Sequence, residues 1–168
     1  MNIRSETEKD YLAVAQVHKL AFGREEEELL VEKIRDSQYY IPELTLLAEV
    51  NDSVIAHAIF SYIHLVGEET FQVLGLAPIA VHPDFQNQGI GSALVNAGLS
   101  KANVLEQTLI IVLGHPEFYS RFGFKPSTNF GIESPFPVPE DAFMVKPLKK
   151  YSPRYKGKVI YPAAFDNV

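Results

Sequence analysis

The sequence of 168 residues contains no cysteine and no tryptophan, and its acidic residues outnumber its basic ones. Without cysteine the chain can form neither a disulfide bond nor a thiolate metal site, and it cannot use a cysteinyl acyl-enzyme. With 15 lysine and arginine residues against 21 aspartate and glutamate residues, the net charge is −6. General nucleic-acid binders neutralise phosphates with a basic surface, so we expect no nucleic-acid partner.

Long apolar runs are missing as well. No segment approaches the length of a membrane span, and the stretch from Met1 to Asp10 is too polar for a secretory signal. We therefore expect no membrane association and, as the default, a cytoplasmic location. A hydrophobic fraction of 46% and a charged fraction of 21% are typical of a globular protein, and no repeat or linker divides the chain. We expect one domain over residues 1–168, without a metal site.

The hydrophobic pattern predicts an α+β chain, in which helical and strand periodicities follow one another. The expected order is a strand at 2–4, helices at 11–22 and 24–37, strands at 44–50, 54–66 and 71–81, a helix at 92–105 and a strand at 108–113. Asn51-Asp52 supplies a hairpin turn, so the middle strands should form an antiparallel meander. The helix at 92–105 should then connect the strand at 71–81 to a parallel neighbour. Within the first helix His18 falls on the polar side, and we expect it at the surface.

The stretch from Val73 to Leu94 is the most informative part of the sequence. Its first half is an uncharged strand, its second half contains Gln86-Asn87-Gln88-Gly89-Ile90-Gly91, and Ser92 opens a helix. A strand, a glycine loop and a helix start bring several backbone N–H groups to one point, where the helix dipole adds about half a positive charge. Such an arrangement binds phosphate.

The spacing of this loop excludes two common phosphate sites. A Walker loop requires a Lys-Ser or Lys-Thr pair, and a Rossmann fingerprint requires a third glycine where Leu94 stands. The pattern Q-x-x-G-x-G instead resembles the pyrophosphate-binding signature of the GNAT (Gcn5-related N-acetyltransferase) superfamily. The later pair Phe118-Tyr119, followed by Gly123-Phe124, resembles the second GNAT signature. Both motifs lie within residues 71–124 and are separated by about one helix and one strand, as the family requires.

The resemblance implies a mixed, mostly antiparallel central sheet flanked by helices, with a splayed parallel strand pair that holds acyl-CoA. Acetyl-CoA is the implied acyl donor, and the implied reaction is direct attack by a primary amine, from a small molecule or a lysine side chain, in a ternary complex. Tyr119 corresponds to the tyrosine that protonates the departing CoA thiolate in many relatives. The implied cofactor-binding residues are Ile79, Ala80, Val81, Gln86, Asn87, Gln88, Gly89, Ile90, Gly91 and Ser92, with His115 as a candidate polar contact. Many relatives dimerise, so a homodimer is one arrangement that the resemblance allows.

Several alternatives stay open from the sequence. Pro78 agrees with the β-bulge that the family places before the loop, or it simply ends a strand. Tyr119 is either the acid or a core residue beside its phenylalanines. Gln86 stands where many relatives have arginine, which predicts a weaker hold on the cofactor. No carboxylate occupies residues 71–81, so the base would be water, His57 or Glu26.

Two further segments have more than one interpretation. The acidic run at residues 25–28 either opposes a helix dipole or attracts a cationic acceptor. The proline-rich segment 125–168 contains short apolar pieces near 142–145 and 159–161 that could be strands, and it either wraps the domain or covers the acceptor site. The leading hypothesis is an acyl-CoA-dependent N-acetyltransferase. The alternatives are a catalytically silent acyl-CoA-binding module and, less favoured, a nucleotide-phosphate binder.

Overall fold

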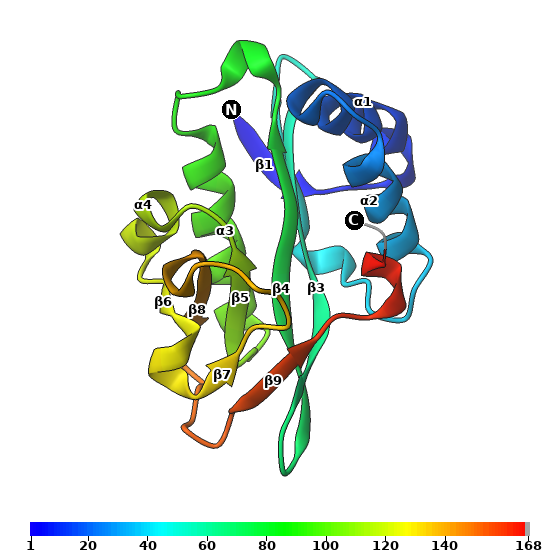
Figure 1. Cartoon of the computed structure of the whole chain (residues 1–168). Helices are drawn as coiled ribbons and strands as arrows, with labels where there is room; N and C mark the ends of the chain where they lie inside the picture. Colours follow the sequence, from blue (N-terminus) through cyan, green and yellow to red (C-terminus); the bar gives the residue numbers. More distant parts are fainter. Residues whose placement is uncertain (167–168) are drawn as a thin grey trace.

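In the computed structural model, which describes residues 1–166, the protein is a mixed β-sheet with helices on both faces (Figure 1). The strands are β1 (Asn2–Ser5), β2 (Thr45–Val50), β3 (Ser53–Val66), β4 (Thr70–Val81), β5 (Leu109–Leu113), β6 (Lys125–Pro126), β7 (Ile132–Glu133), β8 (Phe143–Pro147) and β9 (Gly157–Ile160). The helices are α1 (Tyr11–Phe22), α2 (Glu26–Arg35), α3 (Ile90–Val104) and α4 (Pro116–Tyr119). The predicted α+β fold is confirmed.

The sheet follows the order β1-β2-β3-β4-β5-β8-β6, and β9 pairs with β3 and β7. Its pairings are antiparallel except for β4 with β5 and β7 with β9. The predicted hairpin joins β2 to β3 through Asn51 and Asp52, whose φ angles of 49° and 64° are the left-handed values that a type I′ turn requires. The predicted parallel pair is also present, with α3 as the connection between β4 and β5.

Two helical layers enclose the central strands. In Figure 1, α1 and α2 lie on one side of β3 and β4, and α3 lies on the other. The helix α1 ends as predicted at Gly23, whose φ of 68° is the left-handed value typical of a helix terminus.

The helix α3 packs closely on the sheet at Gly98. The buried ring of Phe60 occupies the space where a side chain at Gly98 would lie, and an added Cβ would be 2.1 Å from this ring. This close approach requires a glycine at that turn of the helix.

The prediction for His18 is wrong. Its side chain is fully buried between α1 and the sheet, and its Nε2 atom lies 2.9 Å from Nδ1 of His57 on β3. The helical pattern places His18 beside Val14 and Val17 on the face that meets the sheet. A polar side chain is tolerated there because a partner across the interface satisfies one of its nitrogens.

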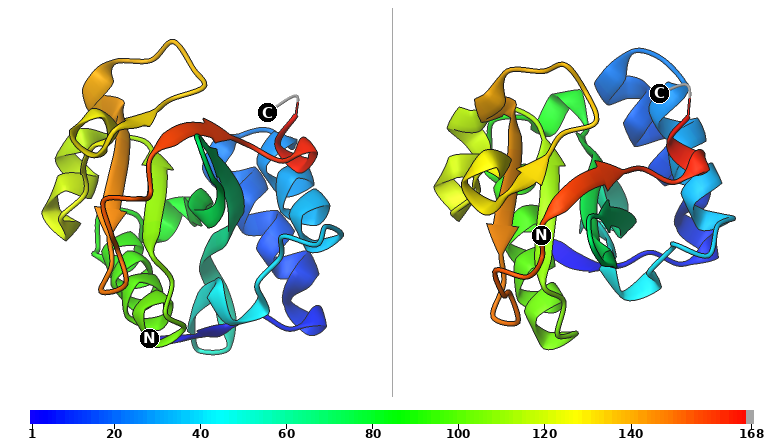
Figure 2. Two further views of the ribbon diagram at one scale, coloured as in Figure 1. Left: turned by 90° about the horizontal axis from the view of Figure 1, so that it is seen from below. Right: turned by 60° about the horizontal axis from the view of Figure 1, so that its bottom comes forward.

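The segment after residue 124 links the two halves of the molecule. The predicted short strands are confirmed as β8, which extends the sheet beyond β5, and β9, which pairs with the far end of β3. Figure 2 shows the chain crossing from β8 past β9 to the side of α2. There Ala164 and Phe165 pack against the apolar cluster of α2 that includes Leu30 and Ile34. The carboxyl-terminal segment therefore closes the molecule opposite α3.

Candidate active site

The parallel strands β4 and β5 separate within the sheet. They are paired only at Leu74 with Ile110 and at Gly75 with Ile111, although β4 continues to Val81. Across β4, Phe60 pairs with Leu76 and Ala58 pairs with Ile79, so two residues of β4 face one residue of β3. This irregularity contains Pro78, which confirms the expected bulge and explains why β4 bends away from β5.

Beyond the bulge, the main chain of β4 offers unpaired groups toward the opening. The N–H of His82 donates to the carbonyl of Ile55 at 2.8 Å, so every second residue of β4 is hydrogen-bonded to β3. By this alternation, Ile79 and Val81 direct their N–H and C=O groups away from β3. The carbonyl of Val81 accepts a hydrogen bond from Nε2 of Gln86 at 3.0 Å. The N–H groups of Ile79 and Val81 are left free to pair with an extended ligand.

The loop before α3 forms one end of this opening. A cavity of about 510 Å³ is lined by Ile79, Val81, Phe85, Gln86, Asn87, Gly89, Ile90, Gly91, Ser92, Phe118 and Arg121. The first backbone bond of α3 runs from the N–H of Ala93 to the carbonyl of Gly89. Within residues 1–166, no acceptor is bound to the amides of the loop and the helix start, which are those of Gln88, Gly89, Gly91 and Ser92. Gly89, Gly91 and Ser92 of this set line the one cavity, and unbound amides beside a cavity at a helix start are what anion binding requires.

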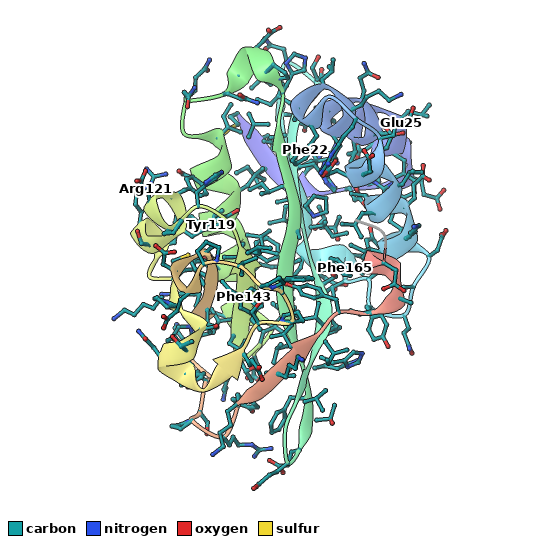
Figure 3. The ribbon with its side chains drawn as sticks, in the orientation of Figure 1. Phe22, Glu25, Tyr119, Arg121, Phe143 and Phe165 are labelled. Atoms are coloured by element: carbon teal, nitrogen blue, oxygen red, sulfur yellow. The ribbon has the colours of Figure 1, made fainter. Side chains whose placement is uncertain are left out.

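Arg121 is a residue of this site that the sequence did not reveal. It follows α4, yet its Nη2 atom donates to Oγ of Ser92 at 3.3 Å, and its guanidinium lies 4.9 Å from the centre of the Phe118 ring. Figure 3 shows it on the α4 side of the opening. It supplies at the loop the positive charge that Gln86 lacks. The available signal was helical spacing, because a residue three positions after Phe118 shares its face.

A second cavity of about 620 Å³ lies on the other side of Ile79, which lines both. Its wall includes the bulge of β4, the start of α4, the helices α1 and α2, and the carboxyl-terminal segment. The lining residues are Phe22, Arg24, Glu27, Leu30, Leu76, Ala77, Pro78, Ile79, Leu113, Gly114, His115, Tyr119, Pro135, Phe136, Ile160, Tyr161, Phe165 and Asp166. The sequence did not decide whether the carboxyl-terminal segment wraps the domain or covers a site. In the structure this segment borders the second cavity.

Tyr119 is both a packed and a cavity-lining residue. Its side chain is 6% exposed and packs edge-on against Phe118 and Phe124 at 4.9 and 5.6 Å between ring centres. Gly114 lies under the ring so closely that an added Cβ would be 2.5 Å from it. Burial raises the pKa of the phenol to about 12, so it stays protonated throughout the neutral range. The two alternatives for this tyrosine are thus compatible.

The structure divides the sequence-predicted residues between the two cavities. Most of the predicted cofactor-binding residues line the first, whereas His115 and Tyr119 line the second. Ala80 and Gln88 are not in either wall: Ala80 is paired with His57, and the side chain of Gln88 turns to the carbonyl of Asp84 at 3.4 Å. Of the two side chains considered as a base, His57 and Glu26, neither lines the first or the second cavity.

His57 belongs to a buried polar network beneath α1 and α2. Glu6 accepts hydrogen bonds from both Nε and Nη2 of Arg35 at 2.9 and 2.8 Å, and its Oε1 atom lies 2.8 Å from Nε2 of His57. Tyr40 donates a further bond to Glu6 at 2.7 Å. Burial would raise the pKa of Glu6, but the bonds from His57 and Arg35 outweigh it and lower the pKa to about 2. The network ties the end of β1 to both helices and to β3.

These bonds fix the protonation of the two histidines. An ionised Glu6 accepts from Nε2–H of His57, which leaves Nδ1 of His57 as the acceptor for Nε2–H of His18. Nδ1 of His18 then has no hydrogen-bond partner among the described residues. Burial lowers the pKa of both rings, that of His18 to about 3, so both are neutral. Sequence patterns gave no signal for this arrangement.

Comparison with known proteins identifies the class. The chain matches a family model described as an acetyltransferase (GNAT) domain over residues 2–127. It is 32% identical over 149 residues to the uncharacterized N-acetyltransferase YhbS of Escherichia coli K12, covering 88% of this chain and 87% of that protein. It is also 32% identical over 130 residues to the uncharacterized N-acetyltransferase YjhQ of the same strain, covering 76% and 72%.

Solved structures agree with the family match. The crystal structure of E. coli YhbS in complex with CoA has a TM-score of 0.88 at 29% identity, covering 98% of this chain and 91% of that one. A GNAT acetyltransferase from Brucella melitensis, crystallised with acetyl-CoA, has a TM-score of 0.80 at 29% identity, covering 98% and 97%. This chain belongs to the GNAT acetyltransferase family. The prediction of an N-acetyltransferase is confirmed.

Between residues 1 and 166, none of the helices combines the length and the apolar character that crossing a bilayer would need.

Proposed function

We propose that this N-acetyltransferase moves the acetyl group of acetyl-CoA to a primary amine, with both substrates bound at once. One observation carries the proposal: the phosphate-binding type of cavity and the cavity beside Tyr119 meet at Ile79, where β4 and β5 have separated. A CoA chain laid along β4 would have its diphosphate at the α3 loop and its thioester next to Tyr119. The complexes of the two related proteins with CoA and acetyl-CoA support this placement.

The donor half of the site would hold acetyl-CoA mostly through backbone groups. The amides between Gln88 and Ser92 bind the diphosphate, and Arg121 adds a full positive charge next to them. The outward N–H groups of Ile79 and Val81 pair with the pantetheine arm, as a missing strand would. An N–H in this position that meets the thioester carbonyl also stabilises the oxyanion that forms there.

The chemical step needs one bond to form and one to break. The amine nitrogen attacks the thioester carbon, the C–N bond forms, and the C–S bond breaks as the sulfur leaves. Tyr119 stays protonated because of its raised pKa, so its phenol donates a hydrogen bond to the departing sulfur. The pKa of a free thiol is about 8.5, so the thiolate can take its proton finally from the attacking nitrogen. No covalent acyl-enzyme is required.

We further propose that residues 1–168 act as a single acetyltransferase domain. The carboxyl-terminal segment supports this, because Phe136, Tyr161 and Phe165 border the second cavity together with Phe22 of α1. This segment would be the wall that faces the acceptor. A homodimer and a cytoplasmic location stay predictions from the sequence.

The role of Tyr119 as hydrogen-bond donor to the departing sulfur is tested by Tyr119→Phe, with Tyr151→Phe as the matched control, since Tyr151 packs against Phe130 outside both cavities. We expect kcat to fall roughly 100-fold with an unchanged affinity for acetyl-CoA. CoA release is followed with a thiol reagent and acetyl-CoA binding by calorimetry. Full turnover in Tyr119→Phe would refute this role at the departing sulfur. Tight acetyl-CoA binding by the wild type, without CoA release for any amine, would identify a silent binding module instead.

A further inference from the structure

The second cavity is bordered by an unusual number of exposed apolar side chains. Phe22, Leu113, Phe136 and Ile160 are each 40–44% exposed, and all four line it. They come from α1, from the end of β5 and from two places in the carboxyl-terminal segment. Exposed apolar residues gathered at one concave place from distant parts of a chain indicate a ligand with an apolar surface.

The apolar wall is largely aromatic. Phe136 stacks on Tyr161 with ring centres 5.5 Å apart and planes at 25°, and Tyr161 contacts Phe165 at 5.0 Å. In Figure 3, Phe22 and Phe165 lie on the side of α1 and α2, across the opening from Tyr119. An aromatic wall of this kind favours a ligand with an aromatic ring, because aromatic rings attract one another beyond the area that they bury.

The charges in this cavity are arranged for a single cation. Glu27 lines it with a side chain only 8% exposed, and both of its oxygens accept hydrogen bonds from Arg24. The side chain of Arg24 is 56% exposed, so it can move into solvent when another cation takes its place. Asp166 adds a second carboxylate to the same wall. Once Arg24 has moved away, the two carboxylates of this wall favour an ammonium and oppose a ligand that carries its own carboxylate.

We propose that the acceptor is a small aromatic primary amine, whose ring lies between Phe22 and the Phe136–Tyr161 stack and whose ammonium replaces Arg24 on Glu27. This inference rests on the proposed acetyl transfer and specifies its second substrate. The cavity volume of about 620 Å³ is that of a site for a small molecule. Glu27 here binds the ammonium and orients it, and the nitrogen loses one proton to water before its lone pair attacks the thioester carbon. The acidic run at residues 25–28 thus divides by position: Glu27 faces the cavity, whereas Glu25 is exposed.

The substrate class is tested with the whole chain, acetyl-CoA and four amines. 2-Phenylethylamine is compared with phenylalanine, which adds only a carboxylate, with ethylamine, which lacks the ring, and with spermidine, which adds charges. We expect kcat/KM for 2-phenylethylamine to exceed each of the others by at least about tenfold. A preference for spermidine, phenylalanine or ethylamine would overturn the inference and leave acetyl transfer intact. No CoA release with any of a wide panel of amines would overturn the proposed function itself.

The role of Glu27 is tested by two variants with opposite expected effects. Glu27→Gln should raise KM for 2-phenylethylamine about tenfold or more, with an unchanged dissociation constant for acetyl-CoA. Arg24→Ala frees the carboxylate and should lower this KM. Glu25→Gln, which removes a charge from a side chain 66% exposed and outside the cavity wall, should change neither. An unchanged KM in both Glu27→Gln and Arg24→Ala would show that the carboxylate does not bind the amine.

Discussion

The buried histidine pair makes the stability of this protein sensitive to mild acid. His18 is fully buried and neutral, with its pKa lowered from 6.5 to about 3 because burial disfavours the charged ring. In the unfolded chain the same ring takes up a proton below pH 6.5. A group with a depressed histidine pKa contributes stability above the unfolded value, and this contribution is lost as the pH falls below it.

The size of the effect follows from these two values. Between pH 7.5 and pH 5.0, proton uptake by unfolded His18 favours unfolding by about 2 kcal/mol. His57 adds to it in the same direction, since burial also lowers its pKa. Glu6, with a pKa lowered to about 2, contributes only below pH 4.5 and is silent in this window. For a chain of this length, 2 kcal/mol corresponds to a fall of roughly 4–8 °C in Tm.

The assay is urea unfolding at pH 7.5 and 5.0, for the wild type and for His18→Gln. Glutamine keeps a donor for Nδ1 of His57 but does not titrate, so the variant should lose about 2 kcal/mol less than the wild type between the two pH values. His64→Gln is the control, because His64 is only half-buried at the far end of β3 and should leave the difference unchanged. Equal pH dependence in the wild type and His18→Gln would refute the assignment of a neutral, buried His18.

Two further predictions concern packing and cofactor affinity. Gly98→Ala should destabilise the protein by about 1–3 kcal/mol in urea unfolding, because its Cβ would lie 2.1 Å from Phe60. Gly91→Ala, whose Cβ would meet atoms only at 3.7 Å or beyond, is the control and should cost little; equal loss in both would contradict the packing argument. Arg121→Gln should weaken acetyl-CoA binding about fivefold in calorimetry at 0.1 M salt and less at 1 M, where the Debye length shrinks from about 10 Å to about 3 Å. Arg154→Gln, a substitution outside both cavities, should not change the affinity, and a salt-independent loss in Arg121→Gln would exclude the charge effect.

Residues close together in the chain made the donor half of the site predictable. A strand, the Q-x-x-G-x-G loop and a helix follow one another directly, so local geometry alone brings the amides of Gln88 to Ser92 together. Proline at position 78 signalled the bulge for a similar reason, since it removes a ladder donor from its own strand. The sequence by itself thus determined the fold class, the strand–loop–helix order around the Q-x-x-G-x-G motif and the bulge at Pro78.

Only the tertiary structure decided which distant residues complete the site. Arg121 reaches Ser92 from 29 positions away, and Phe136 and Tyr161 line the same cavity as Phe22, which lies near the other end of the chain. The burial of His18 depends likewise on His57, 39 positions away. Such contacts are set by the packing of whole elements against one another. Hydrophobic periodicity indicates which face of a helix is buried, but it does not indicate which residues of the neighbouring element contact that face.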